Sequence, residues 1–132
     1  MKSLLVACAI IEQDGNVLAA QRSERMSLPL KWEFPGGKIN DQESPEACLV
    51  REVMEELGLL VTVGRALPNA SHAYNAFSVT LFPFLCTIAA GTLTLHEHKA
   101  VMWLPPDRLA SLDWAAADLP IITAYLELRA AK

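Results

Sequence analysis

The chain has 132 residues, of which 52% are hydrophobic and 20% are charged, so it is long enough for one ordinary domain and too short for two. We therefore expect one domain over residues 1–132. The formal net charge of −4 excludes a broad basic surface for a nucleic-acid polymer, so a phosphate-bearing partner would have to meet a few placed cations or metal ions.

The cysteine pattern and the apolar stretches indicate in which cellular compartment we expect the protein. Cys8, Cys48 and Cys86 are odd in number and far apart, which argues against a disulfide framework and favours reduced thiols in the cytoplasm. Residues 66–95 contain no Asp, Glu, Lys or Arg, but prolines and Gly91 interrupt this stretch, so we predict no membrane span. The apolar run at the N-terminus is too short for an export signal.

The first elements in chain order are predicted strands. Residues 4–11 are apolar throughout, which predicts a strand buried on both faces. Turn residues separate it from a second predicted strand at 17–21, so the two should form a hairpin. A polar loop leads to a short predicted strand at 32–34, and Pro35, Gly36 and Gly37 then predict a tight loop.

A helix over Pro45–Leu57 is the best-marked element. Ser44 suits the N-cap, Pro45 suits the first helical position, and Gly58 follows the last periodic residue. Apolar residues repeat every fourth position on one side, and this stripe should pack on the sheet: Leu49, Val53 and Leu57.

The C-terminal half adds strands and one long helix. We predict a short helix in PPDRLASL, a long helix over Leu119–Ala130, and strands over residues 60–65, 72–75, 77–87, 93–96 and 101–104. Strands mixed with two substantial helices predict an α/β sandwich.

Three glutamates crowd one face of the first helix. Glu52, Glu55 and Glu56 stand at i, i+3 and i+4 in its C-terminal half, where the helix dipole disfavours each acidic side chain by about 0.3–1 kcal/mol. Within the helix only Glu55 has a basic neighbour, Arg51. Hard divalent cations would relieve the repulsion, which indicates a metal site. The alternative is a solvated acidic face.

The surroundings of these glutamates resemble the signature of the Nudix hydrolases. The match covers 23 residues and every specified position of the signature. It consists of Gly37, five residues, Glu43, seven residues and then REVMEELGL, which begins at Arg51. WEFPGGKI and the order of elements resemble the MutT-like branch, and HEH with Ala117-Asp118-Leu119-Pro120 resembles the bacterial CTP pyrophosphohydrolase subgroup. The resemblance implies a Nudix-type α/β/α sandwich with a mixed β-sheet between helices.

The resemblance also implies a reaction and its residues. MutT-like enzymes hydrolyse a nucleoside triphosphate to the monophosphate and pyrophosphate, with metal ions neutralising phosphate charge. Mg²⁺, with Mn²⁺ as a substitute, would bind the Gly36 carbonyl and the carboxylates of Glu52, Glu55, Glu56 and Glu97. One of these carboxylates would activate water. Arg51 would orient the glutamates, and Glu43 would tie the loop to the helix. His96 and His98 leave zinc open, or are polar residues at a strand end.

Nucleotide contacts are expected from residues outside the helix. Arg22 and Lys38 are candidate cations for phosphate oxygens, although either could be merely exposed. Phe34, and with less support Tyr74 or Phe77, could stack on a base, although aromatic residues in strands are more often core.

Asp118 stands where relatives acting on oxidised guanine carry an asparagine. An ionised Asp only accepts hydrogen bonds, which favours the N4 donor of cytosine and hence CTP, dCTP or 5-modified dCTP in nucleotide-pool sanitation. The donors of 8-oxo-dGTP keep that substrate open, and so does a plain capping role in the last helix.

Other readings of the family match remain open. A nucleotide sensor that does not hydrolyse would lose a signature glutamate, and all are present here. Enzymes for nucleotide sugars or dinucleotides often carry extra segments that are not seen in this sequence. We expect a small-molecule nucleotide as partner and a monomer or homodimer.

Overall fold

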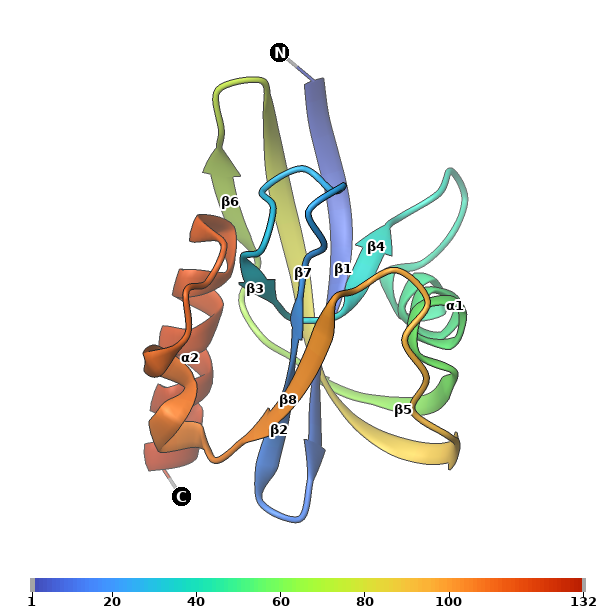
Figure 1. Cartoon of the computed structure of the whole chain (residues 1–132), viewed down its shortest axis with the longest axis vertical. Coiled ribbons are helices and arrows are strands. Elements are labelled where there is room, and N and C mark those ends of the chain that lie inside the picture. The colour runs from blue at the N-terminus through green and yellow to red at the C-terminus, as the bar shows by residue number, and fades with distance from the viewer. Residues whose placement is uncertain (1, 132) are drawn as a thin grey trace.

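The sheet is built around one long hairpin. The computed structural model describes residues 2–131, and in it β1 (Lys2–Gln13) and β2 (Asn16–Gln21) pair antiparallel through a tight turn (Figure 1). Asp14 and Gly15 occupy that turn with φ of 53° and 80°, the left-handed region that two-residue hairpin turns require. This confirms the predicted hairpin.

Eight strands form a mixed sheet. Its main path runs β3-β2-β1-β7-β5, with β4 paired to β1, β6 to β7 and β8 to β2. β1 and β7 are parallel and the other pairs are antiparallel. The remaining strands are β3 (Trp32–Glu33), β4 (Gly36–Lys38), β5 (Leu59–Ala66), β6 (Ala70–Ala73), β7 (Phe77–Gly91) and β8 (Ala100–Leu104).

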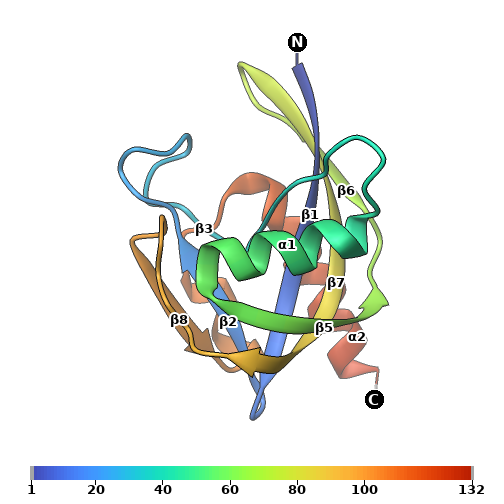
Figure 2. The same cartoon turned by 90° about the vertical axis from the view of Figure 1, so that its right-hand side faces the viewer.

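Two helices lie on opposite faces of this sheet. Helix α1 (Pro45–Leu57) crosses one face and α2 (Leu119–Ala130) covers the other (Figures 1 and 2). Alternate residues of β1 point to the two layers: Cys8 and Ile10 pack with the α2 core, and Ala7, Ala9 and Ile11 with the α1 core. Short 3₁₀ helices η1 (Pro106–Ser111) and η2 (Ala116–Asp118) precede α2. The α/β/α sandwich is confirmed.

Helix α1 begins and ends at the predicted residues. The Ala47 amide donates to the Ser44 side chain (3.1 Å), and Gly58, at φ 69°, donates to the Met54 carbonyl (3.0 Å). Its buried stripe packs on the sheet as predicted. Among residues 2–131, no helix is long and apolar enough to cross a membrane.

Two predicted segments differ in kind from the structure, and the strand predicted at 72–75 lies two residues earlier, as β6. The tight loop predicted at residues 35–37 is largely strand β4, because Gly36 lies so close to β1 that a Cβ there would clash with the Ala7 carbonyl. The strand predicted at 93–96 is wrong. No strand pairs with that segment in the described chain, and the Thr94 and His96 amides instead donate to the last carbonyls of α1.

Candidate active site

The three glutamates of α1 differ in environment. Glu55 is the most open, with its side chain 60% exposed, whereas the Glu52 side chain is 17% exposed. Glu56 is half-buried, and its Oε1 is buried with no hydrogen-bond partner in the described chain. The acidic face therefore extends from solvent into the protein interior.

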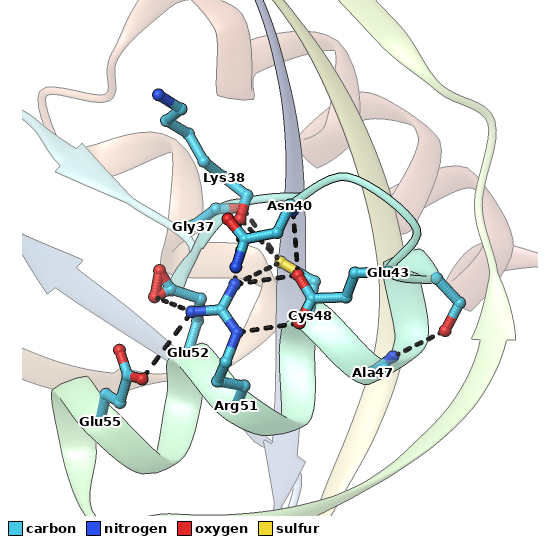
Figure 3. Close-up of polar contacts among 10 residues, drawn as sticks. Gly37, Lys38, Asn40, Glu43, Ala47, Cys48, Arg51, Glu52 and Glu55 are labelled. Carbon is cyan, nitrogen blue, oxygen red and sulfur yellow. Dashed lines mark hydrogen bonds and ion pairs between the residues drawn. The ribbon is translucent and has the colours of Figure 1, made fainter.

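Arg51 connects this face to the preceding loop (Figure 3). Its guanidinium donates to both carboxylate oxygens of Glu43, at 2.8 and 2.9 Å, and to the Lys38 carbonyl at 3.2 Å. Its Nη1 lies 3.4 Å from Glu52 and 3.8 Å from Glu55. The bond from Arg51 lowers the pKa of Glu43 to about 2, and the Asn40 amide adds to this effect. Glu43 thus joins the loop to the helix.

The glycine pair lets the helix approach β4. A Cβ at Gly37 would clash with the carboxyl end of Glu52, so this carboxylate lies directly on the glycine backbone. Gly36 pairs with Cys8 on β1 and lies in the same cavity wall as Glu52. The backbone of β4 and the α1 carboxylates therefore form one surface.

Two cavities meet at this surface. The larger, about 520 Å³, lies between the sheet and the loop after β2, and apolar side chains of β1 and β7 form much of its wall. The smaller, about 260 Å³, is lined by Glu55, His96, Glu97 and two residues that also line the larger cavity, Glu52 and Glu56. The larger volume is in the usual range for a small-molecule ligand site.

The two cations chosen from the sequence both line the larger cavity. Arg22 Nη1 pairs with Glu33 at 2.8 Å, and its other nitrogens donate to Ser27. Lys38 is exposed and forms no ion pair with any residue of the described range 2–131. Contact of either residue with phosphate stays a prediction.

Asp118 lines the larger cavity and is 5% exposed. Its Oδ2 accepts a hydrogen bond from the Phe34 amide at 3.0 Å. Burial, together with the nearby charge of Glu33, raises the pKa of Asp118 to about 8, so the carboxyl is mostly protonated at neutral pH. A protonated Asp118 can also donate a hydrogen bond, so the base contact expected of an ionised Asp118 stays a prediction. The capping alternative is wrong, because its side chain makes no cap bond to α2.

Aromatic rings line the same cavity. Phe34 is 3% exposed and its ring centroid lies 4.8 Å from that of Trp114, so it belongs to the core while bordering the cavity. Tyr74 and Phe77 are half-buried, with centroids 5.1 Å apart, and also line it. Base stacking on Phe34 stays a prediction, and these two rings are less enclosed.

Comparison with known proteins agrees with this geometry. The family model for the NUDIX domain matches residues 1–125. The whole chain is 39% identical to a CTP pyrophosphohydrolase of Escherichia coli K12 and covers 98% of it. Over 94 residues it is 39% identical to an 8-oxo-dGTP diphosphatase of Proteus vulgaris, covering 70% of this chain and 84% of that protein. The solution structure of the Escherichia coli ORF135 protein has a TM-score of 0.85 at 38% identity, covering 100% of this chain and 94% of that one.

The chain belongs to the Nudix hydrolase family. Nudix hydrolases use divalent metal ions. In this Nudix enzyme, burial raises the pKa of Glu52, against the effect of Arg51, and raises that of Glu56 to about 7. Both shifts come mainly from burial, which disfavours the charged form of a carboxyl group.

The acidic face fits a hard cation that keeps part of its water shell. Within residues 2–131, no three His, Cys, Asp or Glu side chains converge closely enough to hold a metal ion by themselves. Mg²⁺ commonly takes one or two carboxylates and keeps several waters, so it does not need such a cage. Glu56 Oε1, buried and without a partner in the described chain, is the oxygen most in need of a cation.

Sequence reasoning missed one residue of this Nudix site, Glu33. Its carboxylate bridges Arg22 and His98 at 2.8 Å each, and it lines the larger cavity. Glu33 and His98 are 65 positions apart, so no spacing rule joins them. The available signal was a lone charge between two aromatic residues in a short strand.

His98 lies just before β8 and its side chain is in the interior. Its side chain is fully buried, and its Nε2 donates to Glu33. Burial alone would lower the pKa of His98, but the bond to Glu33 outweighs this effect and raises it. The imidazole therefore serves as a hydrogen-bond partner of Glu33, which leaves the zinc alternative without support among the described side chains.

Proposed function

We propose that this Nudix hydrolase is a Mg²⁺-dependent nucleoside triphosphate pyrophosphohydrolase that prefers cytidine nucleotides, including CTP, dCTP and 5-modified dCTP. The observation that carries the proposal is the pair of glutamates shared by both cavities. A nucleoside in the larger cavity would direct its phosphates past Glu52 and Glu56 into the acidic one. The chain's similarity to the Escherichia coli CTP pyrophosphohydrolase supports the same conclusion.

The α1 glutamates, Glu97 and the Gly36 carbonyl would hold the metal, which would offset phosphate charge and polarise the attacked phosphorus when bound. Arg51 keeps Glu52 and Glu55 oriented, and Arg22 and Lys38 are placed for phosphate oxygens. Water adds to a phosphorus of the α–β anhydride, the bridging P–O bond breaks, and a carboxylate takes the proton from water. The products are the monophosphate and pyrophosphate.

Base choice rests on similarity more than on Asp118. A neutral carboxyl offers one donor and one acceptor, which pair with N3 and the N4 amino group of cytosine but equally with O6 and N1–H of guanine. Apolar side chains that line the same cavity as Asp118 would accept a 5-methyl group, among them Leu4, Val6 and Leu81. An 8-oxo-dGTP diphosphatase is the second candidate, because a relative of that name matches at equal identity over a shorter range.

The test is kcat/KM with Mg²⁺ for CTP, dCTP, 5-methyl-dCTP, dGTP and 8-oxo-dGTP, with pyrophosphate and monophosphate identified as products. We expect the cytidine nucleotides to exceed both guanine nucleotides by at least ~10-fold, the discrimination that one set of base contacts can supply. A higher value for 8-oxo-dGTP would establish the second candidate. Binding without release of pyrophosphate from any nucleotide would instead indicate a sensor.

The compartment is part of the same proposal. All three cysteines are free and buried, which suits a reducing environment. We propose that the enzyme works in the cytoplasm on the free nucleotide pool.

A further inference from the structure

Glu97 lies on a segment that has no regular structure of its own. Residues 92–99 connect β7 to β8 without strand or helix, so bonds to other elements must hold them. The His96 amide donates to the Glu56 carbonyl at 3.3 Å, and His96 Nδ1 donates to the Glu55 carbonyl at 2.5 Å. Carbonyls in the last turn of a helix have no partner within the helix. The segment is thus attached to the residues whose side chains form the acidic face.

The other side of Glu97 is attached to the interior. His98 is fully buried and donates through Nε2 to Glu33, which Arg22 also holds. The next residue, Lys99, donates its amide to the Gln21 carbonyl on β2 at 2.9 Å. Between these attachments, Glu97 is exposed and lines the acidic cavity beside His96.

We propose that His96 and His98 are positioning residues that hold Glu97 over the α1 carboxylates, His96 by capping the end of α1 and His98 by fixing the segment to Glu33. The inference rests on the proposed function, because it assigns Glu97 a part in hydrolysis. The two imidazoles bond to different elements, His96 to the end of α1 and His98 to Glu33 on β3.

The two histidines use different nitrogens, and this gives a sharp test. An asparagine amide nitrogen lies near the Nδ1 position, and a glutamine amide nitrogen lies near the Nε2 position. His96→Asn and His98→Gln should therefore keep the two bonds. The swapped variants His96→Gln and His98→Asn should lose these two hydrogen bonds, although they introduce the same two kinds of amide side chain.

We expect His98→Asn and His96→Gln to lower kcat by about 10²-fold with little change in KM, because misplacing a reacting group costs about this much. The bond-keeping variants His96→Asn and His98→Gln should stay within about threefold of the wild-type kcat. In a Glu97→Gln background the swapped changes should cost nothing further, because residues that act through one group are not additive. Tyr125→Phe, which removes a buried hydroxyl bonded to Glu12 away from the site, is the stability control and should keep full kcat.

Backbone ¹⁵N heteronuclear NOE values of the metal-free protein give a readout that needs no activity. Residues 94–99 should be ordered in wild type and the bond-keeping variants, and should become mobile in the swapped ones. Unchanged order in the swapped variants, or an equal loss of kcat with and without Glu97, would overturn the inference. Loss of all nucleotide hydrolysis by wild type would overturn the proposed function instead, while the NOE values would still decide the anchoring.

Discussion

Asp118 and Glu56 are carboxyl groups whose chemistry follows from where the fold places them. Asp118 is 5% exposed and bonded to one backbone amide, and Glu56 has a buried oxygen with no partner in the described chain. Burial raises the pKa of each, to about 8 and about 7. Each group therefore binds a proton in the folded apoprotein at a pH where the unfolded chain has released it.

Replacing Asp118 by asparagine should change how stability depends on pH. The folded pKa of about 8 lies above the ordinary value of 3.8, so wild type loses stability as pH rises from about 4 toward 8. Asp118→Asn removes this loss and keeps an acceptor for the Phe34 amide. We expect the variant to gain ~3 kcal/mol relative to wild type between pH 5 and pH 8, measured by urea unfolding.

Asp107→Asn, an exposed change in η1, is the control and should follow the wild-type pH curve. Because all other groups titrate in both proteins, the difference between the two curves isolates position 118. Parallel curves for Asp118→Asn and wild type would show that the carboxyl ionises in the fold as it does in water.

At the scale of elements, local signals were predictable and long-range contacts were not. Helix α1 could be placed to the residue because its cap and its terminal glycine lie beside it in sequence. Strand β4 could not, since glycines have low strand propensity and only the close approach to β1 explains it. Residues 93–96 are predicted as a strand, but their amides cap the end of α1 instead. The site divides in the same way, because Arg51 and its glutamates share one motif while Glu33 meets His98 only in the fold.

The two glycines of β4 should respond differently to alanine. At Gly37 the added methyl group meets the flexible end of Glu52, whereas at Gly36 it meets the backbone of Ala7 and Cys8. Gly37→Ala should therefore cost under ~1 kcal/mol of stability but about 10²-fold in kcat, because Glu52 is displaced. Gly36→Ala should cost ~3 kcal/mol or more, because the backbone of β4 must shift.

Urea unfolding and kcat for both variants, with the preferred nucleotide, separate these two effects. Full kcat in Gly37→Ala would show that the position of the Glu52 carboxylate is not critical. A stability loss in Gly37→Ala equal to that in Gly36→Ala would show that both glycines serve only the packing of β4.

At the scale of the whole molecule, the acidic face couples the stability of the fold to the binding of a metal ion. Helix α1 buries its apolar stripe against one face of the sheet, and this packing holds Glu52 and Glu56 beside each other near Glu97. The folded state thus concentrates negative charge that the unfolded chain would disperse. A cation bound only by the folded state stabilises it by an amount that grows with ion concentration, about 2.7 kcal/mol at 100 times Kd.

Thermal unfolding of wild type and Glu56→Gln, each in EDTA and in saturating Mg²⁺ at pH 8, should show a reversal of order. In EDTA the variant should be more stable by ~2 kcal/mol, because the raised pKa of Glu56 means that its ionised form at pH 8 costs folding energy. This advantage should shrink as pH falls through 7 and vanish below about pH 3.5, where the group is protonated in both the folded and the unfolded state. With Mg²⁺ the wild type should gain more stability and become the more stable protein.

Glu46→Gln, an exposed change at the other end of α1, should show neither the gain in EDTA nor a reduced response to metal. An equal Mg²⁺ response in Glu56→Gln and wild type would remove Glu56 from the metal site.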